Sequence, residues 1–422
     1  MRLSPLLALA GTAMAAVATT AADAADQQQI QLPLHTQSRW ILDASGARVK
    51  MRCINWAGHG ETNVPEGLHK ASVASIADFL RDQGFNCVRL TYSIDHALDP
   101  RVRVADSFAA AANASGVAAE TLEGVYAAVA EKNPDLAQGT REEIFGAVIK
   151  ALWERGIVTL LDNHVSKASW CCNLDDGNGW WDKAQGYNDL NSRFFDTDKW
   201  LDGLSAMATW AKIQPGVAAM SLRNELRQIP VIQGLNDDWY NFVTQGAQRV
   251  HSANPDVLIV IGGSQSATDL SMLKVRDLDV SGWPGKHVWE MHAYSFTVTF
   301  PRIGGCDFVK GEYGWWDGFV LEQDRAWTAP LIVSEFGVGM QGGPNHGGLS
   351  DEDNEYLECL VDWMRGNDAD WALWALQGTY YIREAQADYD ESWGLMNKDW
   401  SGVRNEQFLP LIADLFKVTQ GP

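Results

Sequence analysis

The stretch Val217-Ala-Ala-Met-Ser-Leu-Arg-Asn-Glu225 decides the fold of this chain, because a short apolar run ends in consecutive polar residues. Such runs are typical of strands that are buried on both faces of a parallel sheet. Seven similar runs recur along the 422 residues. The eight expected strands are Val49 to Trp56, Asn86 to Leu90, Ile157 to Asn163, Val217 to Leu222, Val257 to Ile261, His287 to His292, Leu331 to Glu335 and Trp371 to Leu376.

Helical patterns lie between most of these strands and predict an α/β fold, a (β/α)8 TIM barrel in a single catalytic domain with long βα loops. A doubly wound open sheet is the alternative. The Ala-rich stretch from Val104 to Ala137 predicts a helical insertion after the second strand. The expected helices are Ala71 to Gln83, Arg141 to Arg155, Lys199 to Ala211, Asp238 to His251, Gly318 to Ala326, Asp351 to Arg365 and Phe408 to Lys417.

The first 24 residues have the pattern of a secretory signal peptide. Arg2 precedes an apolar stretch from Leu6 to Ala18, and Ala22-Asp-Ala24 offers small residues for cleavage. We therefore expect a secreted, extracellular protein whose catalytic domain spans residues 25–422. No later segment has about 18 consecutive apolar residues, which a membrane span needs.

The composition limits the partners. The formal net charge of −21 disfavours nucleic acid and anionic membranes, which basic patches would bind. Nineteen tryptophans suggest carbohydrate, because indole rings stack on the apolar faces of sugars, although a large core would also use them. No HExxH, P-loop or EF-hand pattern occurs, so we expect neither a metal nor a cofactor. We also expect a monomer.

Six cysteines in an oxidising compartment should include some disulfides. Cys171 and Cys172 are adjacent, and a bond between them would be strained, so we expect one of them to bridge to a distant loop, with Cys306 the first choice. Cys53 and Cys87 lie in apolar runs, where free buried thiols are expected. The sequence does not fix the pairing among these five and Cys359.

Polar residues stand where the predicted strands end, and in a barrel these ends form the active site. Two of them are glutamates, at the ends of the fourth and seventh strands. Glycoside hydrolysis needs one protonated carboxyl and one ionised carboxylate on opposite sides of the scissile bond. We expect Arg89 and Tyr294 to keep Glu335 ionised. The ring contains Arg89, His164, Asn224, Glu225, His292, Tyr294, Glu335 and Trp374.

Two motifs resemble glycoside hydrolase family 5 of clan A. Leu222-Arg-Asn-Glu-Leu-Arg227 resembles its acid/base signature, and Val333-Ser-Glu-Phe-Gly337 resembles its nucleophile strand. Together with Asn163-His-Val-Ser-Lys-Ala-Ser-Trp-Cys-Cys172 and Trp371-Ala-Leu-Trp-Ala-Leu-Gln-Gly-Thr-Tyr-Tyr381, they are similar to a plant and fungal cellulase-like branch. The resemblance covers almost the whole chain after the signal peptide. Leu226 replaces the usual proline, which loosens the subfamily assignment.

The resemblance implies a role for each polar residue. Glu225 would be the general acid/base and Glu335 the nucleophile of a retaining mechanism. Asn224 would bind the 2-hydroxyl of the sugar in subsite −1, and His164 other hydroxyls of that sugar. Arg89 and Tyr294 would flank Glu335, His292 would position Glu225 or the substrate, and Trp374 would be the stacking platform. Further subsite residues are expected among Trp170, Trp180, Trp181, Trp315, Trp316, Trp393 and Trp400.

The leading hypothesis is therefore hydrolysis of a β-linked glucan, an oligo- or polysaccharide, by an endo-β-1,4-glucanase-like enzyme. An exo-β-glucosidase or a β-mannanase of the same family is the alternative. A loop wall that closes the minus subsites would favour exo action, whereas an open cleft would favour endo action. From another class, the chain could be a catalytically idle carbohydrate-binding secreted protein.

Overall fold

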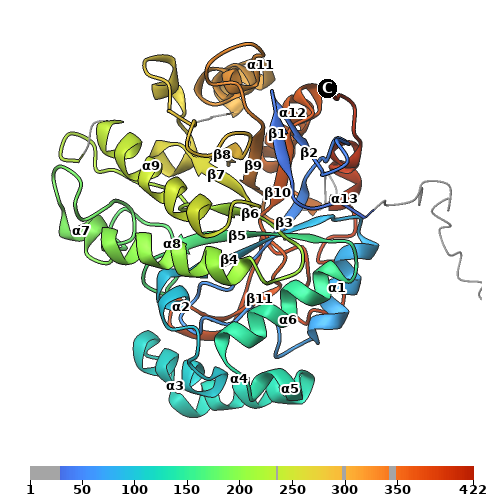
Figure 1. Cartoon of the computed structure of the whole chain (residues 1–422). Helices are drawn as coiled ribbons and strands as arrows, with labels where there is room; N and C mark the ends of the chain where they lie inside the picture. Colours follow the sequence, from blue (N-terminus) through green and yellow to red (C-terminus); the bar gives the residue numbers. More distant parts are fainter. Residues whose placement is uncertain (1–28, 234–235, 297–300, 342–347) are drawn as a thin grey trace, which may run out of the picture.

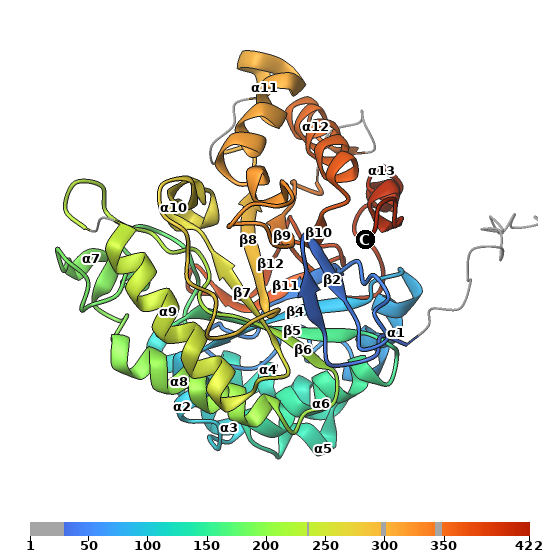
Figure 2. The ribbon, with the colours of Figure 1, turned by 45° about the horizontal axis from the view of Figure 1, so that its top comes forward.

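Parallel strands lie at the centre of the fold, and helices surround them (Figures 1 and 2). The computed structural model describes residues 29–233, 236–296, 301–341 and 348–422, and in these ranges eight strands close into a barrel. The last strand pairs with both the first and the seventh, so the (β/α)8 barrel is confirmed and the open sheet is excluded. The barrel strands are β3 (Arg52–Trp56), β4 (Cys87–Ser93), β5 (Val158–Val165), β6 (Val217–Ser221), β7 (Leu258–Gly262), β8 (His287–Ala293), β9 (Leu331–Phe336) and β10 (Asp370–Leu373).

The barrel interior is apolar at the N-terminal ends of the strands and polar at the other end. Cys53, Val158 and Val260 belong to a buried cluster that also contains Ile41. Ile41 lies in a hairpin of β1 (His35–Gln37) and β2 (Trp40–Leu42), which precedes the barrel in the chain. The N-terminal hairpin therefore packs on the apolar end and leaves the polar end for function.

The helices follow from amphipathic patterns and local caps. In α1, the buried residues Val73, Ile76, Ala77 and Leu80 have the spacing of one helix face. A capping box at Thr140 starts α6. The helices are α1 (Val73–Asp82), α2 (Ile94–Leu98), α3 (Val104–Ser115), α4 (Ala119–Lys132), α5 (Pro134–Ala137), α6 (Arg141–Trp153), α7 (Asp189–Ser192), α8 (Thr197–Ala211), α9 (Asn236–Ala253), α10 (Ser264–Ala267), α11 (Pro301–Trp316), α12 (Asp351–Asn367) and α13 (Phe408–Leu411), with 3-10 turns η1 (Ser271–Lys274), η2 (Gly318–Leu321) and η4 (Ala413–Phe416).

Most of the expected helices are confirmed, including the insertion after the second barrel strand, which forms α3, α4 and α5. The expectation of a helix from Gly318 to Ala326 was wrong, because this segment holds only the short turn η2. The helix of that unit is α11, which comes earlier. Its glycines, among them Gly305 at φ +65°, weaken the helical pattern, so this helix is hard to recognise from the sequence.

A second hairpin, formed by β11 (Thr379–Arg383) and β12 (Gln386–Asp390), was not foreseen. Its two turn residues, Glu384 and Ala385, both have positive φ. Such turns usually contain glycine or asparagine, and the Glu-Ala dipeptide gives no such signal.

The expectation of disulfides is confirmed, but the expected pairing was wrong. Cys53 and Cys87, expected as free thiols, form a disulfide between β3 and β4, whose strand register places them side by side. Cys171 bonds to Cys172, and Cys306 bonds to Cys359, so neither adjacent cysteine bridges to Cys306. The link from α11 to α12 depends on helix packing, which the sequence does not reveal.

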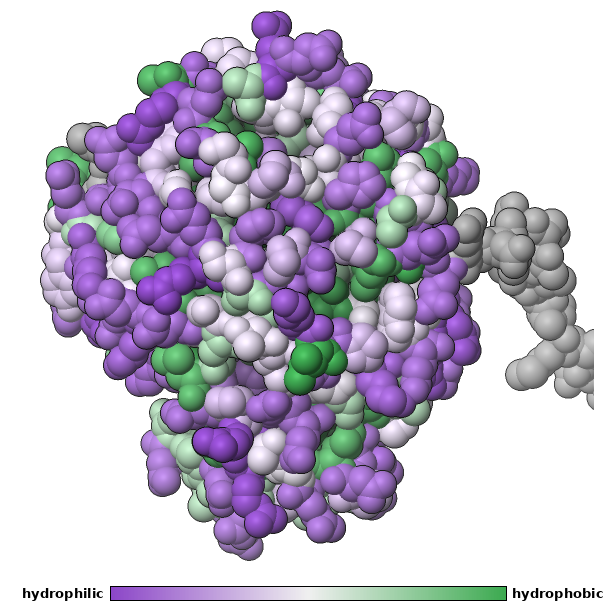
Figure 3. Space-filling view, viewed as in Figure 1, coloured by the Kyte–Doolittle hydropathy of each residue, from purple (hydrophilic) through white to green (hydrophobic). Residues whose placement is uncertain are grey.

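Hydrophilic residues cover most of the face shown in Figure 3, and apolar residues occur there in small groups. Within the described ranges, no helix is long and apolar enough to cross a membrane. The expected signal peptide, residues 1–24, lies outside the described residues.

Candidate active site

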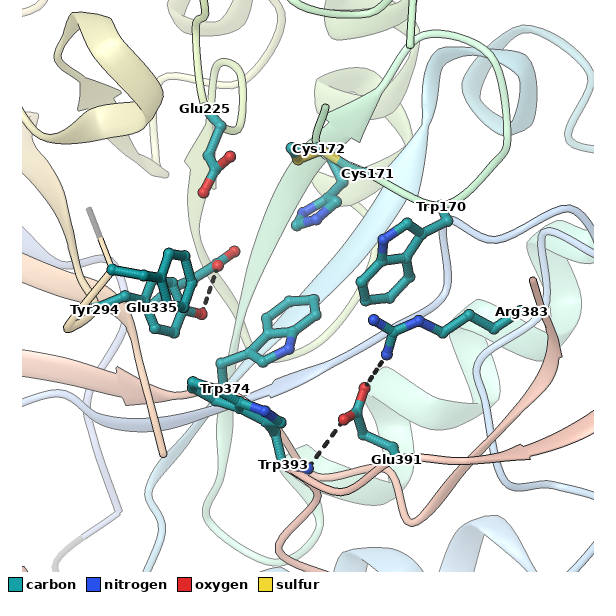
Figure 4. Close-up of a pocket in the computed structure, with 12 residues that line it drawn as sticks. Trp170, Cys171, Cys172, Glu225, Tyr294, Glu335, Trp374, Arg383, Glu391 and Trp393 are labelled. Carbon is teal, nitrogen blue, oxygen red and sulfur yellow. Dashed lines mark hydrogen bonds and ion pairs between the residues drawn. A yellow bond between two sulfur atoms is a disulfide. The ribbon is translucent and has the colours of Figure 1, made fainter. Parts of the chain in front are cut away.

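A cavity of about 320 Å³ opens at the C-terminal ends of the barrel strands, where ligand pockets of this fold occur. Figure 4 shows that Glu225, which follows β6, and Glu335, in β9, lie at one side of it and an arginine–glutamate pair at the other. The volume is at the lower end of the range for small-molecule sites, about 300–1,000 Å³. The lining residues are His164, Trp170, Cys171, Cys172, Glu225, Tyr294, Phe296, Glu335, Trp374, Arg383, Glu391 and Trp393.

Glu335 lies near the end of β9 and is 5% exposed. Its two oxygens have separate donors, Arg89 Nη1 at 2.8 Å and the Tyr294 hydroxyl at 3.0 Å. Burial raises the pKa of Glu335, while the cationic groups of His292 and Arg89 oppose this rise. The structure thus brings together the three residues that the sequence grouped, with the carboxylate oriented by two hydrogen bonds.

Glu225 follows β6 and is more open, with 14% of its side chain exposed. Its backbone has φ +42°, a left-handed conformation that is uncommon outside glycine and is often retained at functional sites. His292 Nδ1 lies 2.9 Å from Glu225 Oε1. One oxygen of Glu225, one of Glu335 and a ring nitrogen of His292 all lie within 4.8 Å of one another. The two carboxyl groups therefore face each other across the cavity.

His292 lies fully buried between these carboxylates. Its Nδ1 is also 3.5 Å from Glu335 Oε2. Burial opposes protonation of His292, yet the carboxylates of Glu335 and Glu225 raise its pKa to about 10. The two carboxylates therefore favour the protonated form of the ring, whose positive charge would offset theirs at the site.

Arg89, in β4, is the centre of the buried polar network. Besides Glu335, it donates hydrogen bonds to Asn55 Oδ1 at 2.9 Å and to Asn224 Oδ1 at 2.8 Å. Nη2 also lies 2.9 Å from a carboxylate oxygen of Glu290. Because one rigid guanidinium holds residues from several strands, it fixes the relative positions of Asn224 and Glu335.

Two buried carboxylates beneath the site were not assigned a role from the sequence. Arg89 Nη2 is 2.9 Å from Asp162 Oδ1 and equally close to Glu290. Burial raises the pKa of Asp162 to about 7 despite Arg89. Burial alone would also raise the pKa of Glu290, but Arg89 and His292 bring it to about 2. A signal existed, because Glu290 and His292 are two residues apart on β8 and so point to the same side.

His164, at the end of β5, is placed to bind a hydroxyl. Asp162 Oδ2 lies 2.6 Å from His164 Nδ1. Burial and the nearby Arg89 lower the pKa of His164 well below its usual value, so the ring is neutral. With Nδ1–H donating to Asp162, Nε2 remains an acceptor next to Asn224 Nδ2, at 3.4 Å. The neighbouring ring of Trp374 stacks on His164, with 5.6 Å between centroids.

The tryptophans expected in subsites divide into three groups. Trp170 and Trp393 line the cavity together with Trp374. Trp180, Trp181 and Trp400 are buried in the core instead. Trp315 and Trp316 lie on α11 and are not among the cavity-lining residues. Composition cannot separate these groups, because indole rings suit both a core and a sugar platform.

Three lining features were not foreseen from the sequence. The Cys171–Cys172 disulfide borders the cavity, and Asn224 Nδ2 lies 3.3 Å from Cys172 Sγ. Arg383 and Glu391, from the hairpin of β11 and β12 and the residue after it, form the opposite border. They come from a segment outside the barrel, where no strand-end argument applies.

An eight-stranded barrel with two glutamates facing each other at its mouth defines the class of glycoside hydrolases. The sequence model described as Cellulase (glycosyl hydrolase family 5) matches residues 42–379. A glycosyl hydrolase 5 family protein of Chamaecyparis obtusa is 39% identical over 401 residues, 93% of this chain and 67% of that protein. The chain belongs to glycosyl hydrolase family 5, as the sequence motifs indicated, and is a glycoside hydrolase.

Other relatives are endoglucanases. An endoglucanase of Paenibacillus polymyxa is 24% identical over 397 residues, 89% of this chain and 85% of that protein. The hyperthermophilic endocellulase of the archaeon Pyrococcus horikoshii has a TM-score of 0.70 at 18% identity, over 93% of this chain and all of that one. The catalytic domain of the major endoglucanase of Xanthomonas campestris pv. campestris has a TM-score of 0.67 at 19% identity, over 91% of this chain and 99% of that one. At these identities, the two solved structures support the fold.

Proposed function

We propose that this protein is a secreted, retaining β-glycosidase that hydrolyses β-linked glucan with Glu335 as nucleophile and Glu225 as general acid/base. The observation that carries this proposal is the distance within 4.8 Å between oxygens of the two carboxylates. Retaining enzymes have their carboxyl groups about 5–5.5 Å apart, whereas inverting enzymes separate them by about 6.5–9.5 Å to admit a water.

The reaction then has two steps. First, Glu335 attacks the anomeric carbon while Glu225 gives its proton to the glycosidic oxygen, so the carbon–oxygen bond to the leaving sugar breaks and a glycosyl ester forms. Second, Glu225 takes a proton from water, whose oxygen attacks the same carbon and releases Glu335. The half-buried position of Glu225 suits proton exchange with solvent, and the two donors on Glu335 suit a fixed nucleophile.

The surrounding residues would bind the sugar in subsite −1. Asn224, held by Arg89, is placed for the 2-hydroxyl, and His164 Nε2, which lies next to the Asn224 amide, for another hydroxyl. Trp374 offers its indole as a platform beside them. His292, close to both carboxylates, would position Glu225 and supply positive charge to the site.

The first candidate substrate is a β-1,4-glucan cut internally, which the similarity to endoglucanases supports. A second candidate, an exo-β-glucosidase, is favoured by the border of Trp170 and Arg383 at one end of the cavity. A neutral glucan suits a chain of net charge −21 better than an anionic polymer does. We also propose that the protein is secreted after cleavage near Ala24 and that it is a monomer.

The stereochemistry of the first product tests the mechanism. Proton NMR of an aryl β-glucoside or cello-oligosaccharide digest should show the β-anomer before mutarotation. Initial α-anomer would contradict the nucleophile assignment.

Substitution separates catalysis from binding. Glu335→Ala should abolish hydrolysis, while Glu123→Ala, a change at an exposed glutamate of α4, should not affect it. If the wild type and Glu335→Ala were equally inactive on β-glucans, mannans and aryl glycosides, the chain would be a carbohydrate-binding protein without activity. Preference for mannans in the same panel would instead indicate a β-mannanase.

A further inference from the structure

The cavity ends at a wall that Trp170, Arg383 and Glu391 form opposite the acid/base. In Figure 4, Glu225 lies at one side, Trp374 in the middle, and the three wall residues at the far side. Trp170 comes from the loop after β5, and Arg383 ends β11. Two segments far apart in the sequence thus meet beyond the stacking platform.

The wall is held together by close contacts. The guanidinium of Arg383 lies over the Trp170 ring, 3.8 Å from its centroid. Arg383 Nη1 lies 2.7 Å from Glu391 Oε2, and the backbone N–H of Trp393 donates to Glu391 Oε1 at 2.9 Å. Glu391 is 2% exposed, so its carboxylate is fixed by these partners. Such a buried, paired arrangement is more rigid than an exposed surface ion pair.

The hairpin that carries the wall is anchored on its outer side as well. Phe108 of the helical insertion packs edge-on against Tyr381 of β11, with 5.0 Å between ring centroids. Glu66 Oε2 accepts a hydrogen bond from the Tyr381 backbone at 2.6 Å. The insertion therefore supports the wall from behind, which gives α3 a structural role at the site.

Within the described residues, the wall lies directly against Trp374, the platform proposed for subsite −1. The rings of Trp170 and Trp374 are in an edge-on arrangement with 6.4 Å between centroids, which is direct contact for an aromatic pair. Tyr380 packs on the other side of Trp170 at 5.1 Å. A sugar stacked on Trp374 would therefore meet indole and guanidinium directly.

The position of the acid/base shows which end of the substrate the wall faces. Glu225 protonates the oxygen of the leaving group, so it marks the reducing-end side of the sugar in subsite −1. The wall lies on the opposite side and faces the non-reducing end of that sugar. Arg383 and Glu391 offer donors and acceptors for its terminal hydroxyls. Arg383 lines the cavity and 21% of its side chain is exposed, so its guanidinium can donate to such a hydroxyl.

We propose that Arg383 and Glu391 recognise the non-reducing terminal sugar of a β-linked glucan, so that the enzyme releases single sugars from this end. This inference rests on the proposed function, because it uses Glu225 to orient the substrate. Arg383 and Glu391 are then the residues that determine exo action, which favours the second candidate above, the exo-β-glucosidase, over internal cleavage.

A blocked substrate tests the proposal on the wild-type protein. Cellotetraose and the same tetrasaccharide with a 4,6-O-benzylidene acetal on its non-reducing sugar are compared, with an aryl β-glucoside as a third substrate. We expect glucose and cellotriose from free cellotetraose and no cleavage of the blocked form, because the acetal cannot pass the wall. Equal cleavage of both forms, or cellobiose as the first product, would overturn the exo proposal while the proposed function stands. If none of the three substrates is cleaved, the proposed function fails and the inference with it.

Substitutions locate the effect in the wall. Arg383→Ala and Glu391→Gln should raise KM for cellotetraose by at least about tenfold, the size expected for hydrogen bonds to charged groups, and change kcat less. Arg383→Lys, which keeps a donor, should recover part of the loss. The matched control is Arg276→Ala, since Arg276 also lies over an aromatic ring, that of Tyr240 at 3.7 Å, and pairs with Asp237 at 2.7 Å, outside the cavity. Equal effects of the wall and control variants would refute the assignment of Arg383.

Discussion

Glu225 and Glu335 have the same kind of side chain but different surroundings, and these surroundings suit different roles. Two hydrogen bonds hold Glu335 in a buried position, whereas Glu225 is more open and contacts His292. An acid that shuttles protons needs access to solvent, and a nucleophile needs a fixed direction of attack. These surroundings agree with the proposed roles of Glu225 as general acid/base and Glu335 as nucleophile.

Removal of the acid should affect substrates according to their leaving groups. Glu225→Ala should lower kcat/KM on cello-oligosaccharides by about 100- to 10,000-fold, the usual contribution of general acid catalysis. An activated dinitrophenyl β-glucoside needs no acid for its first step and should lose less. Added azide should speed its turnover, since azide attacks the glycosyl ester without a base. Equal loss on both substrates, without azide rescue, would contradict the acid/base role.

The imidazolium of His292 should make stability depend on pH. Its pKa of about 10 in the folded protein exceeds the ordinary value of 6.5, so its charge stabilises the fold fully below pH 6.5. This stabilisation, on the order of a few kcal/mol, is lost as the pH rises from 6.5 to 10. The Tm of the wild type should therefore fall more steeply over this window than that of His292→Gln.

The control for this pH series is His35→Gln, which changes a partly exposed histidine of the N-terminal hairpin. It should keep the wild-type slope of Tm against pH. If His292→Gln also kept that slope, the imidazolium would not be the source of the pH dependence.

At the scale of elements, the alternation of side chains along β8 bears on a buried carboxylate, Glu290, that the sequence analysis missed. The sequence marks His292 at a strand end, and the side chain two residues earlier, Glu290, must point to the same side. Glu290 could thus have been predicted to lie inside the barrel. Its salt bridge to Arg89 could not, because that contact depends on how two separate strands are aligned.

The hairpin of β11 and β12 shows the opposite limit. Barrel strands are recognisable where continuous burial leaves a continuous apolar run, as in β7. In the β11–β12 hairpin, β12 is partly exposed and contains polar residues, and the turn lacks glycine. The wall residue Arg383 therefore could not be predicted from the sequence. Trp374 could, because it directly follows a barrel strand.

The Cys306–Cys359 disulfide should be the clamp between α11 and α12. The bond closes a separation of 53 residues, for which the chain-entropy estimate is about 4 kcal/mol. Replacement of both cysteines by serine should lower the free energy of unfolding by an amount of that order and leave kcat/KM nearly unchanged, since neither cysteine lines the cavity. Urea unfolding and initial rates would measure the two quantities. A large loss of activity in the folded variant would show that α11 positions the site.

At the scale of the whole molecule, the barrel separates stability from chemistry. Its N-terminal end is apolar and packed by a hairpin, and its C-terminal end carries the charged network. Eight apolar runs with polar residues at their ends were enough to predict the architecture and the edge at which the site lies. The identity of the sugar was not predictable, because loops outside the repeating units determine the shape of the cavity.

Secretion is a prediction at this scale as well. When the full chain is expressed in a host with a general secretory pathway, the protein in the medium should begin near Ala24 or Ala25. N-terminal sequencing or intact mass would measure this. Replacement of Leu6 and Leu7 by Asp should keep the protein in the cells, because a charged h-region is not recognised. An intact N-terminus on the exported protein would contradict the signal peptide.

The most direct test of the central claim is the identity of the residue that bonds to the sugar. A 2-deoxy-2-fluoro β-glucoside with a dinitrophenyl leaving group forms the glycosyl ester quickly and hydrolyses it slowly. Peptide mass spectrometry of the inactivated enzyme should place the fluorosugar on Glu335. An adduct on another residue, or an active enzyme that forms no adduct and releases inverted product, would contradict the mechanism.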